Sequence, residues 1–296
     1  MSSSALPRSE VKKWRVTLFV VVAGLLTLLM LFGGVRDLLL FSGQSGFPSD
    51  IHCWHEAQSG VLTVIVFGGC LLALLWRPLS KPLLMQFMIL AIAITCIAFA
   101  TVSGAGFNPI MLAIGAGLIA ILVAAYPKPR KLMGISRGAS LSYPLLAITV
   151  VAAIFLAPVM ARELNYQMLG MTEHDVHAMN YHWLTSVVLA LLLLLAGILA
   201  ATKQPGWYVL SFIAGIAFLY LGSMALFLTD YAGSWGTTGG VPGILGGLSY
   251  IATTVVEMRR DGSMVRDEIS HVTPPVILSA AKNPHVANRD SSLRSE

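Results

Sequence analysis

Long apolar runs separated by short polar segments dominate the chain. Eight runs occur, at about 16–35, 60–76, 83–103, 109–126, 143–161, 183–202, 207–229 and 238–257. Most come close to the roughly twenty residues that an α-helix needs to cross about 30 Å of hydrocarbon. The pattern predicts an all-α, polytopic membrane protein with eight transmembrane helices. The last run is the weakest, because it contains residues that favour kinks and close helix contact: Gly239, Gly240, Pro242, Gly243, Gly246 and Gly247.

The composition supports this class. Apolar residues make up 56% of the chain and charged residues 11%, whereas soluble domains have about 45–50% and about 25%. The net charge of +5 does not indicate a nucleic-acid partner, because the basic residues are scattered over short loops. The lipid bilayer is the predicted partner. The three cysteines form no C-x-x-C motif, so neither a disulfide framework nor a cysteine-rich metal site is expected.

The distribution of basic residues predicts the topology, because cytoplasmic loops are enriched in lysine and arginine. With the N-terminus inside, only Arg36 and Arg162 fall in outer segments. The inner segments hold Arg77, Lys81, Lys128, Arg130, Lys131, Arg137, Lys203, Arg259 and Arg260. We therefore predict a cell-membrane protein with both termini cytoplasmic. Residues 1–15 form the cytoplasmic N-terminal segment, 127–142 a basic cytoplasmic loop and 258–296 a disordered cytoplasmic tail.

The two halves of the chain carry similar polar residues at matched positions, about 127 residues apart. Arg36-Asp37-Leu38 matches Arg162-Glu163-Leu164, and Trp54-His55 matches Tyr181-His182. These matches predict a tandem duplication of a four-helix unit, 16–126 and 143–257. The two copies should superpose by a rotation about the membrane normal, which places His55 and His182 at equivalent positions.

Five of the seven histidines fall in two short stretches, each just ahead of an apolar run. If the second and sixth helices extend above the membrane, His52 shares a helical face with His55 and Glu56, and His174 shares one with His177. Helices present zinc or iron ligands at this spacing. The candidate metal ligands are His52, His55, Glu56, His177 and His182. The alternative is that these rings anchor the membrane interface or make pH-sensitive loop contacts.

Haem places a different demand on the same residues. A bis-histidine haem takes one histidine from each of two facing helices, with an apolar slot between them. His55 and His182 occupy the matched positions and are the candidate haem ligands. Arg36 and Arg162 are the candidate residues for an anionic group such as a haem propionate. The alternative for each arginine is an ordinary ion pair with a neighbouring acid.

Three functions follow from these patterns. The first is binding of haem or a transition metal for redox chemistry or cofactor handling. The second is transport of an uncharged or lipid-like solute, with a small apolar ligand. The third is a non-catalytic scaffold. The apolar runs lack lysine, which excludes a retinal Schiff base, and their charge-free interiors argue against an ion-coupled transporter. No catalytic residue is predicted.

Overall fold

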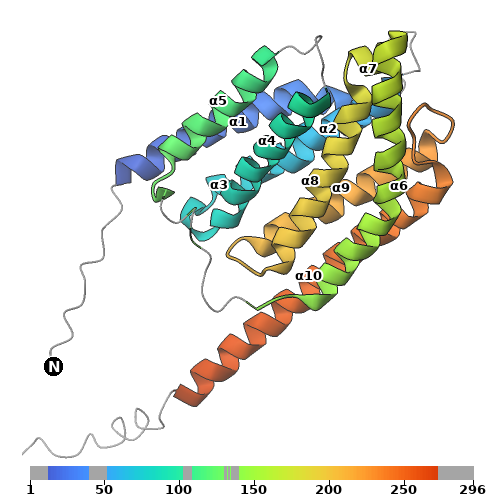
Figure 1. Cartoon of the computed structure of the whole chain (residues 1–296). Helices are drawn as coiled ribbons and strands as arrows, with labels where there is room; N and C mark the ends of the chain where they lie inside the picture. Colours follow the sequence, from blue (N-terminus) through green and yellow to red (C-terminus); the bar gives the residue numbers. More distant parts are fainter. Residues whose placement is uncertain are drawn as a thin grey trace, which may run out of the picture. The chain divides into compact units, whose positions relative to one another are not determined.

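The computed structural model describes residues 13–39, 52–102, 109–129, 132, 134 and 140–272, and all regular structure in these residues is helical (Figure 1). The chain divides into two compact units, Met1–Thr254 and Val255–Glu296. The elements are α1 (Lys13–Leu39), α2 (Cys53–Gly60), the π-helical η3 (Val61–Gly68), α3 (Gly69–Leu75), the short 3₁₀ turn η4 (Pro78–Ser80), α4 (Pro82–Val102), α5 (Pro109–Ala125), α6 (Tyr143–Glu173), α7 (Val176–Met179), α8 (His182–Ala201), α9 (Trp207–Phe227) and α10 (Gly236–Val272).

The predicted all-α, multi-pass architecture is confirmed in its main features. Seven described helices are long and apolar enough to cross a membrane: α1, the continuous α2–η3–α3 helix, α4, α6, α8, α9 and the part of α10 from Gly236 to Gly262. The predicted fourth span corresponds to α5, whose 17 residues, Pro109–Ala125, carry no charged side chain. A helix of the length of α5 rises about 25 Å, which is short of the roughly 30 Å hydrocarbon core. The count of eight spans stays a prediction.

Two helices extend beyond the apolar runs that predicted them. Helix α6 continues to Glu173, so Arg162 and Glu163 lie within it rather than at its end. Glu163, Gln167 and Gly170 are buried along this extension at helical spacing, and Gln167 and Gly170 contact the segment that follows. Helix α10 continues to Val272, past the predicted end at 257. Residues 1–12 and 273–296 lie outside the described residues, so the predictions for both terminal segments stay predictions.

Contacts between the halves of the first unit are reciprocal. The second helix of the first half, α2–η3–α3, contacts α9, the third long helix of the second half. The second long helix of the second half, α8, contacts α4, the third long helix of the first half. Helices α2 and α8 also contact each other. A duplicated unit with a twofold axis would produce this arrangement, but the superposition of 16–126 on 143–257 stays a prediction.

Glycines bring α9 and α10 into close contact, as the sequence predicted for the eighth apolar run. A Cβ atom on Gly247 would lie 2.6 Å from the carbonyl oxygen of Gly215, and one on Gly222 would lie 2.6 Å from the backbone nitrogen of Ile244. Both distances are shorter than van der Waals contact, so only glycine fits at these crossings. Tyr250, one helical turn along α10, is fully buried and contacts Thr149 of α6 through a 2.8 Å hydroxyl–hydroxyl hydrogen bond.

Candidate functional site

Four histidine rings meet where α2 and α8 begin. His52 precedes α2, His55 lies in the first turn of α2, His177 lies on α7 and His182 opens α8. The ring centroids of His52 lie 4.8 Å from His177 and 5.0 Å from His182. Those of His55 lie 5.3 Å from His177 and 5.1 Å from His182, and His177 and His182 are 6.0 Å apart. We call these four residues the histidine cluster.

The path of the chain between α6 and α8 differs from the predicted single helix. His174 adopts a left-handed conformation (φ 58°) and ends α6, and Tyr181 does the same (φ 58°) just before α8. His174 and His177 therefore do not share a helical face, and that prediction is wrong. His174 is exposed. The two turns instead separate the short helix α7, which carries His177 into the cluster.

Two polar side chains hold α7 in place. Gln167 of α6 is fully buried. Its amide nitrogen donates to the carbonyl oxygen of Ala178 at 2.8 Å, and its oxygen accepts from the backbone N–H of Leu184 at 3.1 Å. Asp175 caps α7 by accepting from the Ala178 N–H at 3.0 Å, and it also accepts from the Trp183 indole at 3.2 Å. The sequence pattern alone indicated no such role for either residue.

Asp175 also orients His177. Its Oδ1 atom lies 3.6 Å from Nδ1 of His177. Burial acts to raise the pKa of Asp175, but hydrogen bonds from Trp183, Ala178 and His177 outweigh it, so the pKa falls below its ordinary value of 3.8. The carboxylate is therefore ionised at neutral pH. A carboxylate at one ring nitrogen is the arrangement that commonly orients a histidine for a metal at the other nitrogen.

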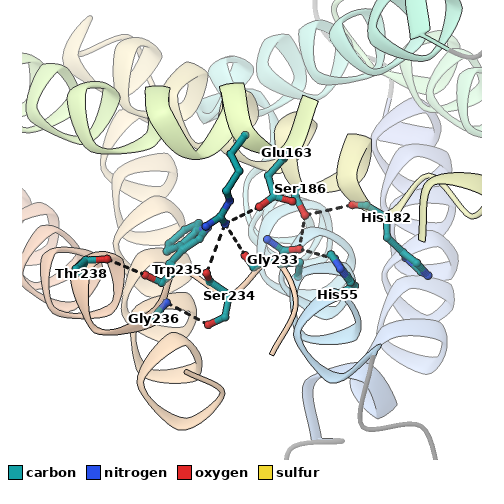
Figure 2. A network of polar contacts seen from close by, with 11 residues as sticks. His55, Glu163, His182, Ser186, Gly233, Ser234, Trp235, Gly236 and Thr238 are labelled. Atoms are coloured by element: carbon teal, nitrogen blue, oxygen red, sulfur yellow. Dashed lines mark hydrogen bonds and ion pairs between the residues drawn. The ribbon is translucent and has the colours of Figure 1, made fainter. Parts of the chain in front are cut away.

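The hydrogen bonds around His55 determine which of its ring nitrogens carries a proton. Nδ1 lies 3.3 Å from Oε1 of Gln58, and this oxygen also accepts from the Ser186 hydroxyl at 2.5 Å (Figure 2). An amide oxygen only accepts, so Nδ1 of His55 is the donor and the neutral ring has its lone pair on Nε2. His55 is 3% exposed, and its Nε2 has no hydrogen-bond partner. Buried Nδ1 of His52 also has none.

A buried carboxylate lies beside the cluster. Glu163 is 1% exposed, and its Oε1 accepts from the Arg162 guanidinium at 2.7 Å. The same guanidinium nitrogen donates to the carbonyl oxygen of Gly233 at 3.1 Å, so Arg162 ties α6 to the loop before α10 (Figure 2). Oε2 of Glu163 and Nε of Arg162 are buried without a hydrogen-bond partner. Arg36 is exposed near the end of α1, and its predicted role at an anionic group stays a prediction.

The loop at Gly233 packs directly on the cluster. Gly233 has a φ of 77°, and a Cβ atom there would lie 2.7 Å from the Trp183 ring, 3.1 Å from Cε1 of His55 and 3.4 Å from Oε2 of Glu163. His55 and Glu163 are therefore neighbours across this backbone. The sequence pattern indicates Glu163 only as part of the repeated Arg-acid-Leu motif. Its burial depends on the loop at 233, which is 70 residues away in the chain, so no local pattern indicated it.

Aromatic rings surround the cluster. The Trp183 ring lies 4.8 Å from His55 and 5.2 Å from His177, and Trp54 packs on Trp235 at 5.5 Å between centroids. Such a shell excludes water and lowers the local dielectric, which strengthens electrostatic interactions inside it. Glu56, a predicted ligand, is half-buried on α2, and its role stays a prediction.

The two predicted cofactors, a transition-metal ion and haem, place different demands on the histidine cluster. Within the described residues, no three His, Cys, Asp or Glu groups are already placed to hold one metal ion. For haem, the two ligating nitrogens would be about 4 Å apart with the porphyrin between the rings. His55 and His182 instead stack with an interplanar angle of 15°. His177 packs against both rings, and His52 packs against His182. These rings leave no porphyrin-wide slot, so haem does not fit.

Comparisons of the chain with protein-family models, curated proteins and solved structures found no match. The arrangement offers several imidazole nitrogens, a buried carboxylate and an aromatic wall at one end of a membrane-spanning helix bundle. Imidazole and carboxylate are side-chain groups that commonly bind metal ions in proteins.

Proposed function

We propose that the protein is a membrane protein whose histidine cluster binds a divalent transition-metal ion such as Zn²⁺. The observation that carries the proposal is the buried, unpartnered Nε2 of His55, with its lone pair fixed by the Gln58 hydrogen bond. A buried polar atom without a partner costs about 1–3 kcal/mol. A bound cation would remove this cost, and imidazole suits zinc, copper, iron and nickel.

The spacing of the rings supports a single ion. Four imidazoles bound tetrahedrally at roughly 2 Å place their ring centres about 5 Å apart, because each centre lies about 1 Å beyond its ligating nitrogen. The five centroid separations within the cluster run from 4.8 to 6.0 Å. The ligating nitrogens do not yet converge on one point. Binding would therefore require rotation of the rings, with the helices already at the right separation.

The surrounding charges also favour a cation. Neutral imidazoles alone leave a divalent charge uncompensated, and a buried charge needs a counter-charge. Asp175 supplies a carboxylate behind His177, whereas Glu163, next to His55, is already paired with Arg162. We further propose that the cluster lies on the outer face of the cell membrane, because the sequence places the basic loops at the opposite end. The proposed role is capture or transfer of the ion, and no reaction is assigned.

Metal titration of the full chain in lipid nanodiscs tests this proposal. We expect the wild-type protein to retain about one Zn²⁺ per chain against a weak chelator, since a four-imidazole site completes tetrahedral coordination. His55→Ala and His182→Ala should each lower the affinity by about tenfold or more, because each removes a ligand. Copper and iron titrations compare the candidate ions.

His174→Ala is the matched control, because His174 lies in the same loop region but is exposed and outside the cluster. It should bind zinc as the wild type does. Circular dichroism and elution volume establish that the His55 and His182 variants are folded. A wild-type protein that retains no transition metal, or equal affinity in all three variants, would overturn the proposal. A Soret band in the absorbance spectrum would return haem to consideration.

A further inference from the structure

The short helix α7 covers part of the histidine cluster through the side chain of His177. This ring packs against three others, and the centroid distances are 4.8 Å to His52, 5.3 Å to His55 and 5.2 Å to Trp183. His55 is 3% exposed and His177 is 7% exposed, whereas His174, just before α7, is exposed. A displacement of α7 would take the His177 ring away from His52 and His55 and leave both of them more accessible.

Few apolar groups hold α7 in its position beside α6 and α8 (Figure 1). Val176 and Met179 are about half exposed, at 52% and 46%. The buried residues of α7 are His177 and Ala178, and the Ala178 methyl group lies against Gly170 of α6. A segment that buries little apolar area opens locally at a lower free energy than the core of the fold.

Left-handed residues lie at both ends of α7. His174 and Tyr181 each have a φ of 58°, a conformation that is costly for residues with a Cβ atom. The docked position of α7 keeps both residues strained, so undocking would relieve the strain. Backbone rotation at a few residues that end helices is enough to move a short segment as a unit.

The loop before α10 also covers the cluster, and it is held more firmly than α7. Trp235 of this loop is 7% exposed and packs on Trp54 at 5.5 Å between centroids. Arg162 donates to the carbonyl oxygen of Gly233 at 3.1 Å. A buried tryptophan removes far more apolar area from water than the methyl group of Ala178 does. Of these two covers, α7 therefore has the lower cost of opening.

We propose that α7 is a lid on the histidine cluster, which moves about His174 and Tyr181 and carries His177 with it. The purpose of the lid rests on the proposed function, because an ion must reach His55 and the ring nitrogens must rotate to converge on it. With α7 open, His55 is accessible to an incoming ion. The return of α7 brings His177 to that ion as a further ligand, so the lid controls the rates of capture and release.

Carbethoxylation of the histidines by diethyl pyrocarbonate tests the lid without any metal. The reagent modifies neutral imidazole, so the rate at each histidine, measured by mass spectrometry on the full chain in nanodiscs, reports its accessibility. Gly170→Ala pushes α7 away from α6, because a Cβ atom at Gly170 would lie 2.5 Å from that of Ala178. We expect the rates at His55 and His177 to rise together by about tenfold or more. The rate at the exposed His174 should not change.

Gln167→Leu is the second lid variant. It removes the hydrogen bonds to Ala178 and Leu184 without adding a side chain at Gly170, and it should raise the same two rates. Gly215→Ala is the matched control, because a Cβ atom there would lie 2.8 Å from the Ile251 side chain and would crowd α10 instead of α7. This variant should show wild-type rates. Circular dichroism and elution volume establish that each variant is folded.

Two results of this experiment would overturn the lid. The first is an unchanged rate at His55 in both lid variants, which would mean that α7 does not control access to it. The second is an equal rise in Gly215→Ala, which would show a general loosening of the helix bundle.

Release of Zn²⁺ to a chelator in a stopped-flow instrument tests the regulatory role. Release should be about tenfold faster from Gly170→Ala than from the wild type, because lid opening limits the rate. Equal release rates would overturn this role. A wild type that binds no zinc, together with the expected carbethoxylation rates, would refute the metal site and leave the lid in place.

Discussion

At the scale of single residues, the site depends on side chains that act through the histidines. Gln58 fixes the proton of His55 on Nδ1, and Asp175 faces Nδ1 of His177. Each of these partners sets the orientation of a ring without occupying the centre of the cluster. Such partners tune a metal site through the ligands that they hold.

The first prediction concerns Gln58. Gln58→Leu removes the acceptor for Nδ1 of His55. The proton of the neutral ring is then no longer held on Nδ1, so the lone pair is no longer fixed on Nε2. We expect zinc affinity to fall about 10- to 100-fold, the usual effect of losing an outer partner of a metal ligand. Gln86→Leu is the matched control, because Gln86 donates to the Leu132 carbonyl oxygen instead. Isothermal titration compares the two, and equal affinities would contradict the assigned role of Gln58.

The second prediction concerns Gly233. Gly233→Ala places a methyl group against Trp183 and His55 at a φ of 77°. Alanine is strained at positive φ, so we expect a loss of more than about 1 kcal/mol of unfolding free energy. Gly117→Ala, in α5 with nothing within 4 Å of its Cβ position, should not destabilise the protein. Unfolding in mixed micelles measures both variants, and a neutral Gly233→Ala would show that the loop does not pack as described.

At the scale of elements, the short helix α7 is the piece that completes the cluster. It has too few residues to be stable alone, and it stays in place through Gln167 and Asp175. The loop before α10 packs on His55 and Trp183 through Gly233, and Arg162 holds this loop by a hydrogen bond. The site is therefore assembled by connections between helices rather than by one helix.

The third prediction is a pH dependence of α7 docking. The pKa of Asp175 is lowered in the folded protein, so its contribution to stability is present above the ordinary value of 3.8 and is lost as the pH falls through the lowered pKa. The wild type should unfold at a higher temperature than Asp175→Asn at pH 7 and at pH 5. The difference should shrink below about pH 4. A difference that is constant down to pH 3 would contradict this account.

At the scale of the whole molecule, seven described helices can cross a membrane, and the sequence predicts that most basic residues lie at one side of the spans. Helices α2 and α8 contact each other, and each contacts the third long helix of the other half. This arrangement brings the start of α2 and the start of α8 to one end of the bundle. An orientation with that end outside would expose the cluster to extracellular metal.

The fourth prediction tests this orientation. A reporter fused after Arg260 should be active only in the cytoplasm, and reporters fused at Ser45 or Thr172 only outside. The physical reason is the excess of lysine and arginine in the segments assigned to the cytoplasm. Alkaline phosphatase and green fluorescent protein fusions measure the two sides. A cytoplasmic signal at Thr172 would invalidate both the eight-span topology and the outward-facing site.

The sequence by itself determined the helical membrane class, because span length and charge bias are local properties that the bilayer imposes on every segment. It also singled out His52, His55, His177 and His182, whose rings lie close together in the structure. Their predicted role as metal ligands stays a prediction. The haem ligation that the sequence suggested does not fit the packed rings. The sequence also gave no indication of the helix break at His174.

Only the tertiary structure decided which polar groups join the site. His174 and Tyr181 both adopt left-handed conformations that local propensity disfavours for residues with a Cβ atom, and these turns separate α7 from its neighbours. Glu163 becomes part of the site because the loop at Gly233 covers it. An apolar cavity of about 450 Å³ between α6 and α10 likewise exists only because two distant segments pack together. Contacts between remote parts of the chain leave no periodic pattern in either part, and for that reason they could not be predicted from the sequence.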